Sequence, residues 1–331
     1  MSEPRPGADT GRSDVFDRIR TACRHVADRA VHVRIRADRI GPFAAELAAE
    51  GLTIPPLDVD RHIVAGEEET VAFFVTLDAV NFGSGYFPYL AKRSGLSGYG
   101  TIASRLADRF RAHGPIPAAQ LATIAPADCA ALFAQRMSSL PIRELMTLFS
   151  RAWNHLGRHV GERFGGRFEG LIEAADRSAA RLVGLLTVQP FFRDAPEYGD
   201  LTVPLYKRAQ ILASDLALAL NEQGLGAFDD LDRQTIFADN LVPHVLRVHG
   251  LLEYADPLAD AIEKEVLIPA GSNEEIEIRA CAVHAVELMR ADLARSGHTT
   301  TSRVLDQILW ARGQAADVKR RKRHRTRTVF Y

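Results

Sequence analysis

The feature that most constrains the fold is an apolar spacing typical of helices, which recurs along nearly the whole chain. The clearest segments span residues 38–50, 99–113, 141–160, 168–188, 205–222, 241–254, 274–295 and 302–315. Such spacing places apolar side chains on one face of an α-helix. By contrast, Val31, Val33 and Ile35 alternate with polar residues, which predicts one short strand. We therefore expect a mainly α-helical protein with at most a small β element near the N-terminus.

The breaks between these segments are short, and no internal repeat separates the chain into parts. A length of 331 residues with 47% apolar and 25% charged residues suits one large domain or two small ones. Residues 1–14 are polar and contain Pro and Gly, so we expect a disordered start. We predict a single compact helical domain over residues 15–331, ending in a basic tail.

The sequence indicates a soluble protein in a reducing compartment. The N-terminus lacks the apolar core of a signal peptide, and no apolar run approaches the ~20 residues that span a membrane. Cys23, Cys129 and Cys281 are scattered and form no CxxC pair. We expect a cytoplasmic monomer that binds neither a membrane nor a metal and uses no cofactor.

Charge bears on the class of partner. The formal net charge is −1, whereas proteins that grip long nucleic acids usually carry a broad basic excess. We therefore expect no stable nucleic-acid partner. Basic residues do gather between Lys319 and Arg327. This stretch is either a solvated C-terminal tail or a contact for phosphate or RNA.

One acidic residue stands between two apolar segments, in RQTIFADNLVPHVL (233–246). Pro243 is tolerated only in the first turn of the helix that follows. Asp239 and Asn240 therefore lie at the start of that helix, where a side-chain oxygen can cap free N–H groups. Asp239 is either a simple cap or a functional carboxylate, kept ionised by the helix start and beside Phe237.

A second carboxylate lies in the segment TSRVLDQILWARG (301–313). Asp306 and Trp310 are four residues apart and share a face that differs from the apolar stripe. An aromatic plane beside a carboxylate can hold a heterocycle by stacking and hydrogen bonds. The alternative is a boundary tryptophan beside a solvated aspartate.

A set of stretches that occur in order over nearly the whole length points to a known family. They are LDAVNFGSGYF (77–87), SGYGTIA (97–103), FGGRF (164–168), FFRD (191–194), YKRAQILASD (206–215), TIFADNLVPHVL (235–246), IPAGSNEEIEIRAC (268–281), VLDQILW (304–310) and HRTRTVFY (324–331). In these stretches the chain resembles the queuosine salvage protein family, whose members hydrolyse queuosine 5′-phosphate to release queuine. The resemblance implies a fold like that of helix-hairpin-helix DNA glycosylases, with a catalytic aspartate at a helix start.

The resemblance also implies the chemistry. Cleavage of a ribose–base bond passes through an oxocarbenium-like sugar, and Asp239 is the residue expected to stabilise that charge and orient the attacking water. Asp306 is expected to accept hydrogen bonds from the guanine-like edge of the base. The full set of expected substrate-binding residues is Phe237, Asp306, Gln307, Trp310, Asn240, His62, Lys207, Arg208, His324 and Arg325.

Within that set, Phe237 and Trp310 would stack on the base, and His62 would meet its cyclopentenediol arm. Lys207 and Arg208, or His324 and Arg325, would hold the 5′-phosphate. For Asp194 and Asp215 we expect structural ion pairs with a nearby Lys or Arg. Two other functions stay open: a glycosylase acting on bases in DNA or tRNA, and a non-catalytic queuosine-binding protein.

Overall fold

The computed structural model describes residues 14–331. Residues 1–13, nearly all of the start that we expected to be disordered, lie outside the described residues. Asp14, the last residue of that expected start, belongs to the ordered chain. Its side chain accepts a hydrogen bond from the backbone N–H of Asp17 at 2.9 Å and so caps helix α1 (Val15–Arg29).

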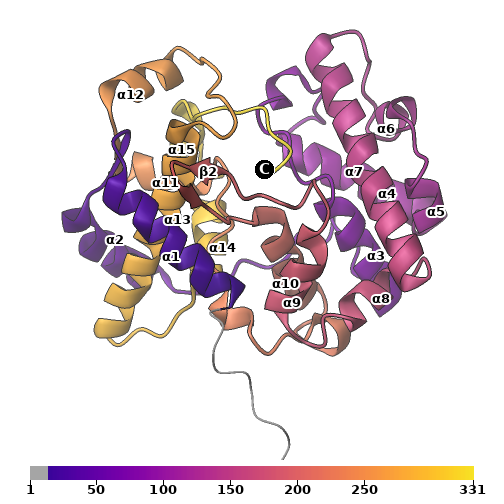
Figure 1. Cartoon of the computed structure of the whole chain (residues 1–331), viewed down its shortest axis with the longest axis horizontal. Coiled ribbons are helices and arrows are strands. Elements are labelled where there is room, and N and C mark those ends of the chain that lie inside the picture. Colours follow the sequence, from indigo (N-terminus) through magenta and orange to yellow (C-terminus); the bar gives the residue numbers. More distant parts are fainter. Residues whose placement is uncertain (1–13) are drawn as a thin grey trace, which may run out of the picture.

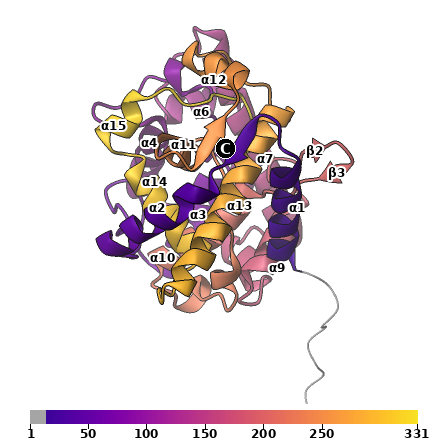
Figure 2. The same ribbon diagram turned by 90° about the vertical axis from the view of Figure 1, so that its left-hand side faces the viewer.

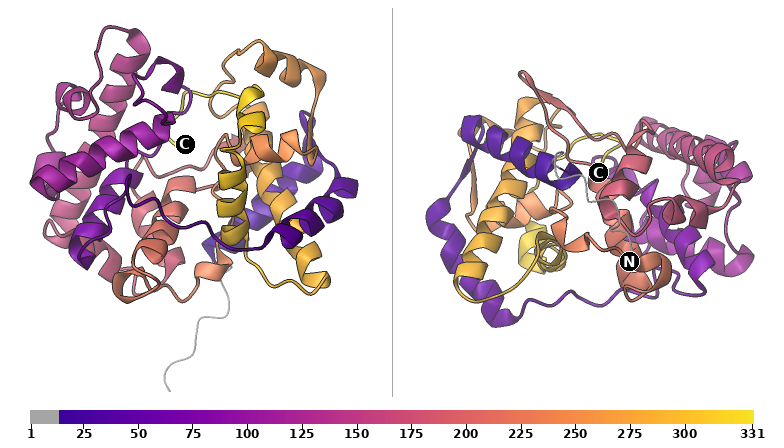
Figure 3. Two further views of the ribbon diagram at one scale, coloured as in Figure 1. Left: turned by 180° about the vertical axis from the view of Figure 1, so that it is seen from behind. Right: turned by 60° about the horizontal axis from the view of Figure 1, so that its bottom comes forward.

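Helices dominate the described chain, as predicted, and Figures 1 and 3 show two groups of helices side by side. Besides α1, the first group contains α2 (Ala37–Glu50), α11 (Val242–Val248), α12 (Asp256–Glu263), α13 (Asn273–Arg295), α14 (Ser302–Arg312) and α15 (Ala316–Arg320). The second contains α3 (Glu67–Asp78), α4 (Gly98–His113), α5 (Ala118–Leu121), α6 (Pro126–Leu132), α7 (Leu140–Phe164) and α8 (Phe168–Glu173). No helix within residues 14–331 has the length and apolar character needed to cross a membrane.

Two further helices, α9 (Ala179–Thr187) and α10 (Lys207–Ala219), join the groups. Helix α10 packs against α3 and α9, and α9 in turn contacts α1. Short 3₁₀ helices span Phe87–Tyr89, Gly224–Gly226 and Leu231–Arg233. Residues 51–66 connect the groups on the rear face, where the left view of Figure 3 shows them crossing from α2 to α3.

Helix α13 is the centre of the first group and packs against α1, α2, α11 and α14; Figure 2 shows α1 running alongside it. In the sequence, Ser272-Asn-Glu-Glu275 predicts a capping box at its start, and Gly297 predicts its end. Ser272 accepts a hydrogen bond from the backbone N–H of Glu275 at 3.4 Å, and Gly297 just past the last turn has a φ of 84°. The other half of the expected capping box differs, because Glu275 accepts from the N–H of Gly271, at 3.2 Å, and not from that of Ser272.

The β structure consists of two-stranded antiparallel sheets. Strand β1 (Val33–Ile35) forms where the sequence predicts it and pairs with β4 (Leu252–Tyr254). The helix expected over 241–254 is therefore wrong in its second half. Gly250 has a φ of 76°, which a continuing helix cannot contain, and β1 offers the following residues a partner strand. Strands β2 (Glu197–Tyr198) and β3 (Leu201–Thr202) form a small hairpin that projects from the surface in Figure 2.

The helix expected over 168–188 is interrupted between α8 and α9. Asp176 and Arg177 have φ angles of 48° and 59°, in the left-handed region, so no helix passes through them. A distant residue defines the new start: the carboxylate of Asp230 accepts hydrogen bonds from the backbone N–H groups of Ala179 at 2.6 Å and Ala180 at 3.1 Å. Local apolar spacing could not report this tertiary cap.

The basic C-terminal stretch is only partly a solvated tail. Residues 319–323 are exposed, whereas the following residues, here called the C-terminal strap (324–331), enter the space between the two helix groups, where Figure 1 marks the C-terminus. Backbone hydrogen bonds of 2.9 Å run from Ile268 N–H to the carbonyl of Arg325 and from Gly83 N–H to the carbonyl of Tyr331. The strap is therefore part of the packed structure.

Candidate active site

The carboxylate of Asp239 lies at the start of α11, where the sequence places it. Its Oδ1 accepts hydrogen bonds from the backbone N–H groups of Leu241 at 2.7 Å and Val242 at 3.0 Å. Pro243 occupies the first turn of the helix. The residue is half-buried, and Oδ2 accepts no hydrogen bond from residues 14–331. One oxygen is thus anchored while the other can meet a ligand.

Two helices hold the extended segment that leads to Asp239. From α14, the Asp306 carboxyl accepts a hydrogen bond from the backbone N–H of Phe237 at 2.8 Å. From α13, Nε of Arg279 donates to the carbonyl of Ala238 at 2.9 Å. A segment held on both sides keeps its side chains in place before a ligand arrives, which is what electrostatic stabilisation of a transition state requires.

Asp306 is buried, with 4% of its surface exposed. Burial raises the pKa of its carboxyl to about 8; the nearby Asp239 carboxylate adds to this effect, while the Phe237 N–H and Lys207 oppose it. At neutral pH the carboxyl is therefore mostly protonated. Because Oδ1 accepts from Phe237, Oδ2 is the atom left to meet a ligand. We expected Asp306 to accept hydrogen bonds from the base through both oxygens as an ionised carboxylate, which does not fit this protonated state.

Lys207 begins α10 and is buried, and its ammonium lies 3.5 Å from the carbonyl of Asn81. Burial lowers the pKa of Lys207, and the carboxylates of Asp239 and Asp78 oppose this shift. The Lys207 side chain therefore lies in the neighbourhood of Asp239, although the two residues belong to different segments of the chain. Within residues 14–331 no three His, Cys, Asp or Glu side chains are arranged to hold a metal ion.

The two aspartates for which we expected structural ion pairs behave differently. Asp194 forms a buried pair with Arg279, with Nη2 to Oδ2 at 2.5 Å. Asp215 is buried on α10 but forms no ion pair with the described part of the chain. Burial and the neighbouring Asp78 carboxylate raise the pKa of Asp215 well above its ordinary value, while Lys207 opposes this. Asp215 therefore belongs to the acidic neighbourhood of Lys207.

The aromatic residues expected to meet the base come from two elements, the segment that leads to Asp239 and helix α14. Phe237 is buried two residues before Asp239, and Trp310 is half-buried on α14. The ring of Tyr99 meets Trp310 edge to face at 6.1 Å. His62 contacts the hydroxyl of Tyr99 through Nε2 at 2.9 Å and the carbonyl of Asp58 through Nδ1 at 2.8 Å. Both ring nitrogens of His62 are thus occupied.

Two polar residues expected at the site flank these aromatics. Asn240 is buried, and its Nδ2 has no hydrogen-bond partner within residues 14–331. Gln307 is half-buried on α14, next to Asp306. A buried amide without a partner is costly, so Asn240 is a group that a bound ligand can satisfy.

Two of the expected phosphate ligands are engaged elsewhere. Arg208 is buried and donates to four backbone carbonyls, those of Asp78, Ala79, Phe191 and Val329. Its guanidinium therefore ties α10 to the C-terminal strap, and we no longer expect it to hold phosphate. Arg325 donates to the carbonyl of Glu265 at 2.7 Å, at the end of α12.

His324, the third expected phosphate ligand, is buried, and neither ring nitrogen has a partner within residues 14–331. Burial, together with the nearby Arg279 and Arg323, lowers the pKa of His324 to about 3. The imidazole is therefore neutral and can donate or accept a hydrogen bond but supplies no positive charge at neutral pH.

The comparisons with known proteins identify the family. The sequence profile described as "Queuosine salvage protein" matches residues 61–331. The chain belongs to this family. A "Queuosine 5′-phosphate N-glycosylase/hydrolase" from Sphaerobacter thermophilus is 38% identical over 318 residues, which are 95% of this chain and 97% of that protein.

Relatives from eukaryotes carry the same description and match about half of their length. The protein from Dictyostelium discoideum is 43% identical over 160 residues, 48% of this chain and 50% of its own. The mouse protein is 36% identical over 165 residues, 47% of this chain and 49% of its own. The family resemblance noted in the sequence is confirmed.

Asp78 is a residue of this neighbourhood that reasoning from sequence missed. It ends α3, whose preceding residues from Thr70 onward are all buried, and its own side chain is fully buried. Burial raises the pKa of Asp78 to about 6, against the effect of the Asn81 amide, which donates to Oδ1 at 3.0 Å. Oδ2 accepts no hydrogen bond from residues 14–331. The signal that could have identified it is an acid ending the run TVAFFVTL (70–77), in which the two threonines are the only polar residues.

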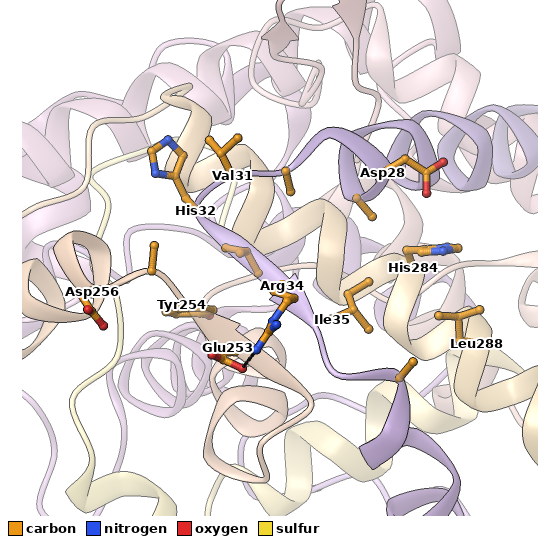
Figure 4. A pocket seen from close by; sticks show the side chains of 15 residues that line it. Asp28, Val31, His32, Arg34, Ile35, Glu253, Tyr254, Asp256, His284 and Leu288 are labelled. Atoms are coloured by element: carbon orange, nitrogen blue, oxygen red, sulfur yellow. Dashed lines mark hydrogen bonds and ion pairs between the residues drawn. The ribbon is translucent and has the colours of Figure 1, made fainter.

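A separate hollow of about 690 Å³ lies on the outer side of the first helix group. Figure 4 shows it beside β1 and β4, with Arg34 and Glu253 paired at 2.6 Å and His284 and Leu288 projecting from α13. None of the residues expected at the substrate site lines it. This hollow therefore plays no part in the site around Asp239.

Proposed function

We propose that this protein hydrolyses the N-glycosidic bond of queuosine 5′-phosphate and releases queuine. The relatives' description names that reaction, and the surroundings of Asp239 supply the groups it needs. The observation that carries the proposal is the half-buried Asp239 carboxylate, with Oδ1 fixed by two backbone N–H groups and Oδ2 free.

Bond cleavage builds positive charge on C1′ and the ring oxygen of the ribose. The free oxygen of Asp239 stabilises that charge and accepts a hydrogen bond from the attacking water. Because Oδ1 is already held by N–H groups, the carboxylate needs no reorganisation as the charge develops. The sugar is then released as ribose 5-phosphate after water adds to C1′.

The leaving base needs a different kind of help. Queuine is a 7-deazaguanine, in which carbon replaces N7, so protonation at that position cannot assist its departure. Asp306 is protonated up to a pH of about 8, and its free oxygen can donate a hydrogen bond to the base as negative charge develops there. Phe237 and Trp310 stack on the base, a kind of contact that contributes about 1–3 kcal/mol in single-strand recognition.

The 5′-phosphate meets Lys207, the buried cation beside Asp239. His324 and Asn240 add neutral donors whose nitrogens have no partners within residues 14–331. His62 contacts the hydroxyl of Tyr99 and holds that ring against Trp310, so we assign it no contact with the substrate. We propose that the protein acts on the free nucleotide, because a net charge of −1 does not favour binding to DNA or tRNA.

The test is release of queuine from queuosine 5′-phosphate, followed by chromatography, for the wild type and Asp239→Asn. Asparagine preserves the oxygen that caps α11 but removes the negative charge. Release by the wild type alone supports the proposal, and equal release by both removes Asp239 from the mechanism. Binding without release would favour a queuosine-binding protein, and release only from intact nucleic acid would favour a DNA or tRNA glycosylase.

A further inference from the structure

The buried Asp194–Arg279 pair touches the backbone on both sides of the site. Arg279 Nη1 donates to Asp194 Oδ1 at 3.0 Å and to Glu275 at 3.1 Å, and its guanidinium lies 4.5 Å from the ring centre of Tyr331. Its remaining nitrogen, Nε, donates to the carbonyl of Ala238 at 2.9 Å, directly before Asp239. Arg279 is 1% exposed and Asp194 2%.

Asp194 holds the backbone at the start of α10, as Arg279 holds the backbone before Asp239. Its Oδ2 accepts from the backbone N–H of Lys207 at 3.3 Å, and its carbonyl accepts from the N–H groups of Leu205 at 2.9 Å and Tyr206 at 3.1 Å. Tyr206 has φ 48° and ψ 39°, a left-handed conformation that costs free energy for a tyrosine. These contacts hold the chain in that conformation at the point where α10 begins with Lys207.

We propose that the Asp194–Arg279 pair is a positioning element for the reaction, which sets the separation between the Lys207 ammonium and the Asp239 carboxylate. One end of the pair holds the backbone of Lys207, and the other holds the carbonyl that precedes Asp239. This inference rests on the proposed function. Neither Asp194 nor Arg279 needs to touch the substrate.

Stability alone does not account for such a pair. Buried ion pairs are often replaced by apolar residues of similar volume without loss of stability, because desolvation offsets much of their attraction. What apolar residues cannot supply is a planar fork that binds a carboxylate with two nitrogens and a carbonyl with a third. The fork fixes direction as well as distance, which is the property a reacting site requires.

Helix α13 also provides a matched control. Glu277 lies two residues before Arg279 and is fully buried. Its carboxylate accepts hydrogen bonds from the backbone N–H groups of Val31, His32 and Val33 and from the hydroxyl of Tyr198. These partners lie in β1, in the residues just before β1, and in β2, and none belongs to the site. Glu277→Gln therefore perturbs a buried charge on the same helix without touching the segments that carry Lys207 and Asp239.

The experiment compares Asp194→Asn, Arg279→Lys and the double change Asp194→Asn with Arg279→Gln against Glu277→Gln. For each we measure the urea midpoint, kcat and KM per folded enzyme, and queuine affinity by calorimetry. A misplacement of about 1 Å can cost about 100-fold in rate, so we expect kcat to fall about that much in the three pair variants. Queuine affinity stays at the wild-type value, because Phe237 and Asp306 remain in place.

Arg279→Lys separates positioning from folding. Lysine keeps the buried charge and one contact with Asp194 but cannot also reach the Ala238 carbonyl. We therefore expect Arg279→Lys to keep most of the wild-type stability while its kcat falls. The double variant removes both charges of the pair, and the buried Glu275 carboxylate keeps its hydrogen bond from the N–H of Gly271. We expect Glu277→Gln to lower the urea midpoint and leave kcat per folded enzyme unchanged.

Two results would overturn the inference while leaving the proposed function standing. One is a kcat in the pair variants that falls no further than in Glu277→Gln. The other is that every pair variant fails to fold while Glu277→Gln folds, which would make the pair a requirement for folding alone. A wild type that releases no queuine would instead overturn the proposed function, and the positioning role with it.

Discussion

The Asp306 carboxyl accepts a hydrogen bond from the backbone N–H of Phe237 at 2.8 Å, two residues before Asp239 in the chain. Helix α14 thereby positions the segment that carries Asp239 as well as the group we propose for the base. The two carboxyls have different surroundings: burial and the neighbouring Asp239 raise the pKa of Asp306 to about 8, whereas Asp239 is half-buried and accepts hydrogen bonds from two backbone N–H groups. We propose different roles for the two carboxyls because their surroundings differ.

The cap at Asp239 can be separated from its charge. We expect Asp239→Asn to reduce kcat by about 100-fold or more, because the carboxylate that stabilises the ribosyl cation is lost. The free energy of unfolding of Asp239→Asn should stay near that of the wild type, because asparagine is as good a helix cap as aspartate. Asp239→Ala should lose a further ~1 kcal/mol. Urea denaturation and queuine release measure the two effects, and equal stability of the Asn and Ala variants would show that the cap contributes nothing.

The alkaline limb of the activity profile should report Asp306. If its protonated carboxyl donates to the departing base, kcat/KM falls as the pH rises through about 8. Asp306→Asn carries a donor that does not titrate, so its lower activity should stay level across the same range. Initial rates of queuine release over pH test this. A wild-type rate that instead rises through that pH would show that the ionised form binds the base.

The same pKa shift affects stability. An unfolded Asp306 releases its proton near pH 3.9, whereas the folded carboxyl keeps it up to about pH 8. Between these values the folded state binds more protons, so its stability decreases as the pH rises. Asp78, whose pKa is raised to about 6, acts in the same direction. We expect the urea midpoint of Asp306→Asn to fall less steeply with pH than that of the wild type, and parallel slopes would contradict the shift.

Recognition of the phosphate should depend on Lys207. We expect a higher kcat/KM for queuosine 5′-phosphate than for queuosine. Lys207→Met should lower the ratio of these two kcat/KM values about 10-fold, because one hydrogen bond to a charged group is lost. Competing the two substrates in one reaction gives the ratio directly. The variant's activity on the nucleoside serves as the control for damage to the site. An unchanged ratio would place the phosphate on other groups.

The contact between Gly85 and the C-terminal strap can be tested with two glycines. A Cβ at Gly85 would collide with the carbonyl of Thr326, so Gly85→Ala should cost about 1–3 kcal/mol of unfolding free energy. Gly161 lies exposed within α7, with nothing near its missing Cβ. Gly161→Ala should therefore stabilise the protein by roughly 0.5–1 kcal/mol. Thermal denaturation should show a lower stability for Gly85→Ala and a higher one for Gly161→Ala. An unchanged stability of Gly85→Ala would mean that the C-terminal strap moves to make room for the added Cβ.

Local features were predictable because the forces that set them act within a few residues. Apolar spacing located most helices, and Pro243 placed Asp239 at a helix start where its oxygen reaches the N–H groups of Leu241 and Val242. Alternation over Val31, Val33 and Ile35 located β1. Each of these depends on backbone geometry that neighbouring residues impose.

Tertiary structure decided everything that depends on burial and on partners distant in sequence. Residues 252–254 became a strand because β1 lay beside them, and α9 begins where Asp230 caps it. Arg208, expected at the phosphate, instead binds four carbonyls, since the fold closes over it. The raised pKa of Asp306 and the lowered pKa of Lys207 arise first from loss of water around each group. Desolvation depends on the assembled fold, so the spacing of residues along the chain cannot predict it.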